Sequence, residues 1–137
     1  MTLNLKKLSG EFSIAQVENL DQSLIDHLSS QSPHFWTVAQ TSEEISVVSN
    51  IAQHSSFSKV EGPWTAFRVV GQLDFSLTGI LSRCSTLLAD AKISVFAVST
   101  FDTDYFLVRK ESEVAAISAW RLGGIIIDEI YEEESPL

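Results

Sequence analysis

The side chains most capable of catalysis or metal binding do not show the spacing that such sites need. The three histidines, His27, His34 and His54, are separated by 7 and 20 residues, so they lack the i, i+4 spacing of a helical metal site. Asp102-Thr103-Asp104 fits an Asp-x-Asp metal and phosphate motif, but so short a match is common by chance and no glycine-rich phosphate loop accompanies it. Cys84 is the single cysteine and falls on an apolar stripe, which favours a buried hydrophobe over a nucleophile. We therefore expect no metal, no cofactor and no catalysis.

Composition and charge narrow the class of protein further. The 137 residues are 45% hydrophobic and 20% charged, which is typical of a soluble globular chain with room for one domain or two small ones. The 9 basic and 18 acidic residues give a net charge of -9, which opposes binding to nucleic acid or to an anionic membrane. No apolar run is long enough to span a membrane, and no leader precedes one. With one cysteine and no internal disulfide, we expect a cytoplasmic protein.

The elements that would position a site are clearest in the second half of the chain. After Asp74, apolar residues recur at spacings of 3, 1, 3, 3, 1 and 3, which is the stripe of an amphipathic helix that this carboxylate is placed to cap. Gly123-Gly124 marks the end of a later helix. The remaining segments are short and rich in β-forming residues. In order, we predict strand Trp64–Val70, helix Leu77–Ala91, strands Ile93–Val98 and Tyr105–Val108, helix Glu111–Leu122 and strand Ile125–Ile130.

This order predicts an α+β fold of ferredoxin-like type, in which four antiparallel strands carry two helices on one face. The first half is less regular, and we interpret it as a degenerate second copy. A loop at Gln53–Pro63 separates the halves, which divides the chain into an N-terminal unit at 1–60, a C-terminal unit at 61–131 and an acidic tail at 132–137. The candidate elements of the first half are strands Leu3–Leu8, Phe12–Val17, Phe35–Ala39 and Ile45–Val48, and helix Ser23–Leu28.

Two segments of the second half resemble a known family. Leu73–Gly79, with the sequence LDFSLTG, and Ser99–Val108, with the sequence STFDTDYFLV, are together similar to the ACT domain. In the first half, Thr41–Val48 resembles the matching segment of that family. More narrowly, the chain resembles small bacterial proteins with tandem ACT domains that are similar to the cytosolic arginine sensors of animals.

The resemblance implies two βαββαβ units of ACT type, the first degenerate, and an amino-acid ligand held at the interface between units. In the animal sensors the ligand is held by a segment like Ser46-Val47, by a glycine at the start of a helix like Gly79-Ile80, and by a segment like Thr100-Phe101 with a following acid like Asp104. Those sensors contain four ACT units, whereas this chain has room for two. The identity of the amino acid therefore stays open.

The charged and small residues of this set suit the charged groups of an amino acid. Gly79 follows the expected helix cap, where unpaired amides and the helix dipole favour a carboxylate and the missing side chain permits close approach. Asp104, and also Asp74, could accept hydrogen bonds from an ammonium or guanidinium group, because charge-assisted bonds are stronger than neutral ones. We expect these residues to set the charge preference of the site.

The remaining expected contacts come from the backbone and from apolar side chains. The backbones of Ser46-Val47 and Thr100-Phe101 could add edge-strand hydrogen bonds, and the side chains of Ile80 and Phe101 would cover the aliphatic part of the ligand. The predicted ligand-binding residues are therefore Ser46, Val47, Asp74, Gly79, Ile80, Thr100, Phe101 and Asp104.

Each of these assignments has a structural alternative. Asp74 could serve only as a helix cap, and Gly79 could be small only so that the helix lies close to the sheet. Asp104 could stabilise the hairpin turn through hydrogen bonds to the backbone. Phe101 and Ile80 could be core residues, as apolar side chains on such elements usually are.

We expect a non-enzymatic amino-acid-binding sensor or regulatory module. The alternative is a ligand-free module for protein interaction or assembly, and a metal-dependent enzyme is a minor third alternative. We also expect a homodimer, because ACT units often pair side by side through strands and helices and two units leave edge strands that another copy could cover. The expected partners are a small-molecule amino acid, a second copy and a regulated protein, with no nucleic acid and no membrane.

Overall fold

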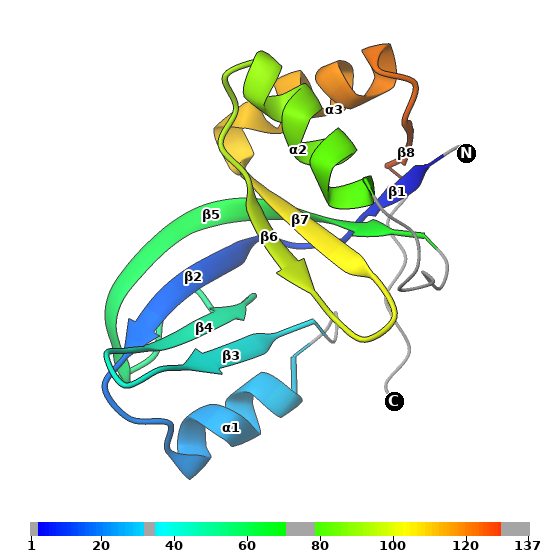
Figure 1. The fold of residues 1–137 in the computed structure, drawn as a ribbon. Helices are drawn as coiled ribbons and strands as arrows, with labels where there is room; N and C mark the ends of the chain where they lie inside the picture. Colours follow the sequence, from blue (N-terminus) through cyan, green and yellow to red (C-terminus); the bar gives the residue numbers. More distant parts are fainter. Residues whose placement is uncertain (1–2, 32–34, 71–78, 130–137) are drawn as a thin grey trace. The chain divides into compact units, whose positions relative to one another are not determined.

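The computed structural model describes residues 3–31, 35–70 and 79–129, which hold three α-helices and eight β-strands in a mixed α+β fold (Figure 1). The chain divides into two compact units. Among the described residues, unit 1 comprises 3–8, 65–70 and 79–129, and unit 2 comprises 9–31 and 35–64. The predicted acidic tail at 132–137 lies outside the described residues.

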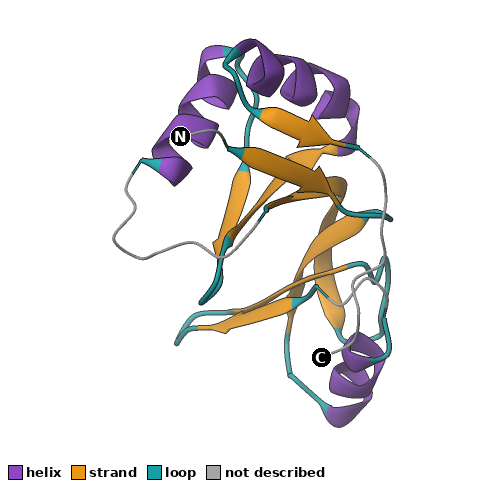
Figure 2. Ribbon diagram, turned by 90° about the vertical axis from the view of Figure 1, so that its right-hand side faces the viewer, coloured by secondary structure: helices purple, strands orange, loops and turns teal. Residues whose placement is uncertain are grey.

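Unit 1 contains the predicted order of strand, helix, strand, strand, helix and strand. The structure confirms a helix from residue 80, with Ile80, Cys84 and Leu88 buried and Leu81 exposed, as well as the predicted hairpin and the later helix. The strands of this unit are ordered β6-β7-β5-β1-β8, and helices α2 and α3 lie on one face of them (Figure 2). Its elements are β1 (Asn4–Lys7), the end of β5 (Phe57–Val69), α2 (Ile80–Asp90), β6 (Phe96–Ser99), β7 (Asp104–Arg109), a 3-10 turn (Lys110–Ser112), α3 (Glu113–Leu122) and β8 (Ile126–Asp128).

The first strand of the chain belongs to unit 1, whereas the sequence placed it with the first half. Strand β1 pairs antiparallel with β5, with Leu5 opposite Val69, and parallel with β8, with Leu5 opposite Ile127. Leu3 and Leu5 are buried in the same apolar core as the helices of this unit. The insertion of β1 between β5 and β8 adds a fifth strand to the expected four. A pairing between residues so far apart in the sequence leaves no local signal.

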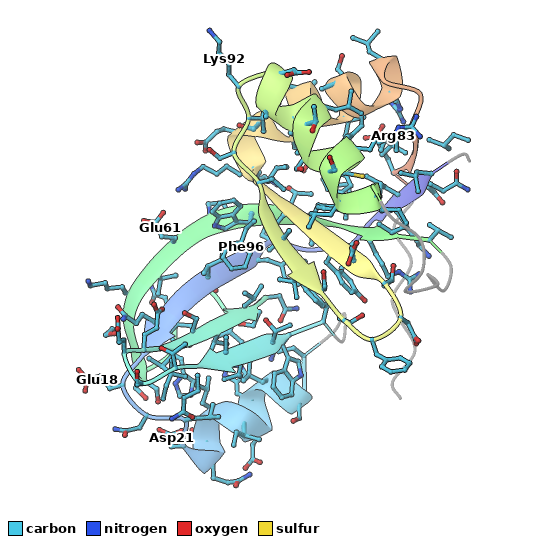
Figure 3. The ribbon with its side chains drawn as sticks, in the orientation of Figure 1. Glu18, Asp21, Glu61, Arg83, Lys92 and Phe96 are labelled. Atoms are coloured by element: carbon cyan, nitrogen blue, oxygen red, sulfur yellow. The ribbon has the colours of Figure 1, made fainter. Side chains whose placement is uncertain are left out.

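The core of unit 1 forms around Trp120, a fully buried residue of α3. Its indole ring contacts Phe67 of β5 edge-on, at 4.9 Å between ring centroids, and lies 6.3 Å from Phe106 of β7. Its Nε1 donates a hydrogen bond of 3.1 Å to the backbone oxygen of Cys84 in α2. Arg83 (Figure 3) makes a second link between the helices, because its guanidinium donates to the Gly123 oxygen at 3.0 Å. The two helices are therefore joined to each other as well as to the sheet.

Two predicted boundaries are wrong. The expected loop Gln53–Pro63 is replaced from Phe57 onward by strand β5, which accommodates Gly62 and Pro63 at a register shift against β2, where proline is tolerated. Helix α2 begins at Ile80 with Gly79 as its N-cap in the left-handed region at φ 83°, so the expected cap Asp74 does not hold this position. Asp74 itself lies outside the described residues.

Unit 2 contains β2 (Phe12–Val17), α1 (Gln22–Ser29), β3 (Thr37–Gln40), β4 (Ile45–Ser49) and the first part of β5. These elements confirm the four predicted for this segment to within two or three residues. The strand order is β3-β4-β2-β5, and the chain passes from β4 to β5 through residues 50–56 without a second helix. Leu24 and Leu28 of α1 pack with Val17, Val47 and Ile51, which gives this unit an apolar core of its own.

An ion pair in unit 1 joins the first strand to the last helix. Lys7 Nζ on β1 donates to Glu113 Oε2 at the start of α3, and Thr65 Oγ1 on β5 donates to Glu113 Oε1 at 2.6 Å. Burial would raise the pKa of the Glu113 carboxyl, but hydrogen bonds from Lys7 and Thr65 and the charges of Lys7 and Lys110 hold it below its ordinary value. One carboxylate thus connects β1, β5 and α3.

We predict that Glu113→Ala lowers the free energy of unfolding by about 1.5 to 3 kcal/mol, the usual effect of losing hydrogen bonds to a charged group. The Lys7 ammonium would stay largely buried without this carboxylate. Urea unfolding measures the loss. The matched control is Glu129→Ala, which removes the carboxylate paired with Arg121 where the two side chains are 45% and 50% exposed and should cost at most about 1 kcal/mol. Equal losses in the two variants would contradict the prediction.

The same carboxylate predicts how stability depends on pH. The folded pKa of Glu113 is lower than the unfolded one, so its contribution is complete above the unfolded pKa and is lost as the pH falls through the folded pKa. The difference in unfolding free energy between wild type and Glu113→Ala should therefore stay constant from about pH 7 to about pH 5 and shrink as the pH falls further toward about 3. Urea unfolding across this range tests it, and a constant difference would show that the carboxylate does not act through its charge.

Candidate functional site

Helix α2 begins without a side-chain cap. Gly79 is the N-cap at φ 83°, a conformation that L side chains rarely adopt, and a glycine supplies no side-chain cap for the first turn. A Cβ built on Gly79 would meet no atom of the described residues within 4 Å, so none of these residues requires a glycine for close packing of the helix. The helix dipole and the amides of the first turn favour an anion at this position.

Ile80 is a core residue. Its side chain is 6% exposed and packs in the apolar cluster of unit 1 with the buried residues of both helices. The structural alternative is therefore confirmed for Ile80, and only its backbone is placed to contact a ligand.

The turn of the β6–β7 hairpin is held by hydrogen bonds among its own residues. The Thr100 amide donates to the Thr103 oxygen at 2.8 Å, and the Thr103 amide donates back to Thr100 Oγ1 at 3.3 Å. Thr103 Oγ1 donates to the Val69 oxygen of β5 at 2.7 Å, which fixes the turn to the sheet. Ser99 Oγ donates to Asp104 Oδ1 at 2.7 Å. Sequence reasoning missed the roles of Ser99 and Thr103. Their only signal in the sequence is that they are small hydroxyl residues in the same turn as Asp102 and Asp104.

The turn uses part of the Asp104 side chain and leaves most of the Phe101 side chain exposed. Asp104 supports the hairpin through Oδ1, which confirms part of the structural alternative, while no described residue donates to its Oδ2. Phe101 is 77% exposed, so the alternative that it is a core residue is wrong. An aromatic ring and a carboxylate therefore lie three residues apart on one turn, which is a pair able to contact an aliphatic chain and an ammonium group.

Cys84 is a buried residue of α2. Burial raises the pKa of its thiol to about 11, with the Asp104 charge raising it and the Arg83 charge opposing the rise. Gly79, Ile80, Thr100, Phe101 and Asp104 all belong to unit 1, on two segments of it.

Ser46 and Val47 belong to unit 2, in strand β4. The prediction that their backbone forms an exposed strand edge is wrong, because β4 pairs on both sides: Val47 lies opposite Ala15 of β2 and Val38 of β3. The Val47 side chain is fully buried in the core of unit 2. The Ser46 hydroxyl donates to Glu44 Oε1 at 2.7 Å. The backbone of Ser46 and Val47, the Val47 side chain and the Ser46 hydroxyl are therefore already used by the fold, which the sequence did not predict.

Unit 2 contains a polar pocket of about 360 Å³ bordered by Glu18 and Asp21 (Figure 3). The acid Asp21 in this pocket has a role in the fold. Asp21 Oδ1 accepts from the Leu24 amide and caps α1, while Oδ2 accepts from Ser56 Oγ at 2.8 Å. These two bonds, with the charge of His54, lower the pKa of the Asp21 carboxyl. Both oxygens of this acid therefore serve the fold.

In the described ranges, no group of three histidine, cysteine or acidic side chains is arranged to hold a metal ion. No helix in the same ranges is long and apolar enough to cross a membrane.

Comparison with known proteins places these segments in a family context. Residues 59–121, which include α2 and the β6–β7 hairpin, match the ACT domain family. Ser46 and Val47 precede the matched segment. Among curated proteins, none matches the chain.

Solved structures share the fold over almost the whole chain. A protein from Agrobacterium tumefaciens has 25% identity and a TM-score of 0.80, over 98% of this chain and 96% of that one. A Vibrio cholerae protein, described as of unknown function and a possible transport protein, has 18% identity and a TM-score of 0.70, over 90% and 91%. The regulatory subunit of aspartate kinase from Thermus flavus has 8% identity and a TM-score of 0.59, over 90% and 97%. At such identities the last two show the fold alone.

We predict that the Cys84 thiol is unreactive in the folded protein, because it is fully buried and its pKa is about 11. An aromatic disulfide reagent at about pH 8 should modify it only after unfolding in urea. The control is Ser82→Cys in a Cys84→Ala background, which puts a thiol on the exposed side of the same helix and should react at once. Equal rates for the two thiols would contradict the burial of Cys84.

Proposed function

We propose that this protein is a non-enzymatic regulatory module that binds an amino acid, with the ligand held at an interface between ACT units. The observation that carries the proposal is that the segment matching the ACT family holds both a helix start without a side-chain cap, at Gly79, and an acid on the hairpin turn, Asp104, whose Oδ1 alone is bonded to Ser99. ACT domains are regulatory modules that commonly bind amino acids. The fold shared with a regulatory subunit of aspartate kinase supports the same class of function.

The two ends of an amino acid have different requirements, and unit 1 has a group for each. The first-turn amides of α2 would hold the carboxylate, and the ring of Phe101 would cover the aliphatic part. Oδ2 of Asp104 would accept from the ammonium group or from a cationic side chain, while Oδ1 keeps its bond to Ser99. Asp74 and the Ser46-Val47 segment complete the proposed set, from outside the described residues and from unit 2 respectively.

The wider proposal concerns how the chain is built and where it acts. We propose that unit 2 is a degenerate ACT unit, because its strand order is that of the ferredoxin-like fold and only the second helix is missing. We propose a cytoplasmic location, since the single cysteine is buried and cannot pair within the chain. A second copy and a regulated protein are the proposed macromolecular partners.

A ligand-free assembly module is the second candidate function. This alternative is favoured because the fold already uses several of the predicted ligand-binding residues. The Thr100 amide donates within its own turn, Ile80 is buried in the core, and the strand that holds Val47 is paired on both sides. Under this alternative the hairpin and the helix start would only stabilise unit 1.

We predict that a thermal-shift screen and calorimetry against the twenty amino acids will identify a ligand, because a molecule that binds only the folded state stabilises it. Asp104→Asn should then weaken binding by about 1.5 to 3 kcal/mol, since it removes the charge but keeps an acceptor for Ser99. Asp102→Asn is the matched control, because it removes the same charge from the same turn and should change binding little. Gly79→Asn tests the carboxylate end of the ligand and should also weaken binding. Asparagine tolerates φ 83°, but its side chain would obstruct the ligand carboxylate at the helix start.

Two results would overturn the proposed site. If no amino acid binds the wild-type chain at millimolar concentration, the assembly alternative replaces it. If a ligand is found but Asp104→Asn and Gly79→Asn both bind it as tightly as wild type does, the ligand lies elsewhere. Circular dichroism of each variant separates loss of binding from loss of fold.

A further inference from the structure

Unit 2 has the strand order of a ferredoxin-like unit but one helix fewer. In that fold two helices lie on one face of the sheet, whereas the described part of unit 2 holds only α1 (Figure 1). Its strands β4 and β5 are joined by the short connection at residues 50–56. In unit 1 the connection from β7 to β8 holds α3, which buries Ala116, Ile117 and Trp120. Unit 2 therefore has a place on its sheet where a second helix would lie.

The side of the sheet that carries α1 is only partly covered. Val47, Ala15 and Val60 lie opposite one another on β4, β2 and β5, and directly opposed residues of antiparallel strands share a face. Val47 is fully buried in one cluster with Leu24 and Leu28 of α1, and Ala15 is also buried. Val60 is 44% exposed. Among the described residues, α1 therefore covers this face at β4 and leaves it open at β5.

A mostly apolar groove of about 310 Å³ lies at this open part of the face. It is bordered by Ser13 of β2, by Ala52 of the connection, and by Val60 and Pro63 of β5. Ser13 Oγ donates to the Ile51 oxygen at 2.6 Å, which fixes the start of the connection to β2. The connection therefore forms one wall of the groove and does not fill it. A groove of this kind accepts apolar side chains from a partner.

The charge of unit 2 indicates the chemistry of the occupant. Its described residues include seven acidic side chains and one lysine, a net charge of -6, whereas those of unit 1 include eight basic and seven acidic side chains, a net charge of +1. One lysine cannot neutralise seven carboxylates, so unit 2 attracts cations. Glu11 lines the groove, and Glu61 (Figure 3) follows Val60 on β5. The same charge opposes a second copy or the acidic segment Glu132–Glu134 in this groove.

A helix suits this surface better than an added strand does. Strand addition needs a continuous row of backbone amides and carbonyls along an edge, and Pro63 of β5 has no amide. The pairing of β5 with β2 also shifts register near this proline, and Lys59 and Glu61 are residue types that discourage pairing at an edge. A helix instead presents apolar side chains at i, i+3, i+4 and i+7 to one face of a sheet.

We propose that unit 2 binds a basic amphipathic helix of a partner protein on the face of β2 and β5 where a ferredoxin-like unit holds its second helix. The apolar side of the partner helix contacts Ala52, Val60 and Pro63, and its lysine or arginine residues meet Glu11 and the negative charge of the unit. The inference does not rest on the proposed amino-acid site, because no residue of that site borders this groove.

Fluorescence anisotropy of a labelled peptide, measured on the full chain without any amino-acid ligand, tests the proposal. The probe is an alanine-based helical peptide of about 18 residues, with leucines at i, i+3, i+4 and i+7 and lysines on the other face. Its affinity for wild type should fall several-fold between about 50 and 300 mM salt, because salt screens the lysine contacts. A scrambled peptide of the same composition has no apolar stripe and should bind about tenfold more weakly or less.

Two substitutions locate the binding surface. Ala52→Asp should weaken binding of the helical peptide about tenfold or more, because it puts a carboxylate into the apolar groove while it makes the unit more acidic. Ala39→Asp is the matched control, because it makes the same substitution at an exposed alanine of β3 that does not line the groove. Val60→Asn removes an apolar contact without a change in charge and should also weaken binding. Circular dichroism of each variant separates loss of binding from loss of fold.

Three results would overturn the proposal. The helical peptide could fail to bind wild type at about 1 mM, or bind no more tightly than the scrambled peptide. Ala52→Asp could bind the helical peptide as tightly as Ala39→Asp does. Light scattering of the chain alone could give a mass above 15.1 kDa that Ala52→Asp returns to that of one chain, which would assign the groove to a second copy.

Discussion

The arrangement of unit 1 depends on the burial of one indole. Trp120 packs against Phe67 and Phe106 on the sheet and donates to the backbone of Cys84 in α2. A buried indole needs a partner for its N–H, because leaving that donor unsatisfied costs about 1 to 3 kcal/mol. The position of α3 on the sheet therefore determines the position of α2. The Arg83 bond to the Gly123 oxygen and the burial of Ile80 and Leu88 in the same core hold α2 as well.

The sequence predicted the elements that local patterns encode. The stripe through Cys84 and Leu88 and the apolar face around Trp120 have helical spacing, and the turn between Ser99 and Asp104 is rich in small polar residues. The sequence did not predict the place of β1, because its parallel pairing with β8 joins residues more than 120 positions apart. It also placed a loop at Gly62-Pro63, where a register shift against β2 lets the strand continue.

The sequence predicted which residue types suit an amino-acid site, but it did not predict the structural role that each of these residues has in the fold. Gly79 was chosen for its missing side chain, and the structure shows a different reason for glycine, a positive φ at the N-cap. Asp104 was chosen for its charge, and one of its oxygens supports the hairpin. Ser46 and Val47 were chosen for a strand edge that does not exist, because the order of strands in a sheet depends on pairings that no local pattern reveals.

A residue that the fold needs can serve a ligand only through the atoms that the fold leaves unused. By this criterion Val47, Ile80 and Thr100 have little left, since their side chains or amides are already buried or bonded. Gly79 has the amides at its helix start, Phe101 has an exposed ring, and Asp104 has a second carboxylate oxygen. These three supply an anion site, an apolar contact and an acceptor. Because the acceptor is a carboxylate, selectivity among amino acids should come from what the ligand presents to Phe101 and Asp104, while the helix start would hold the carboxylate that all amino acids share.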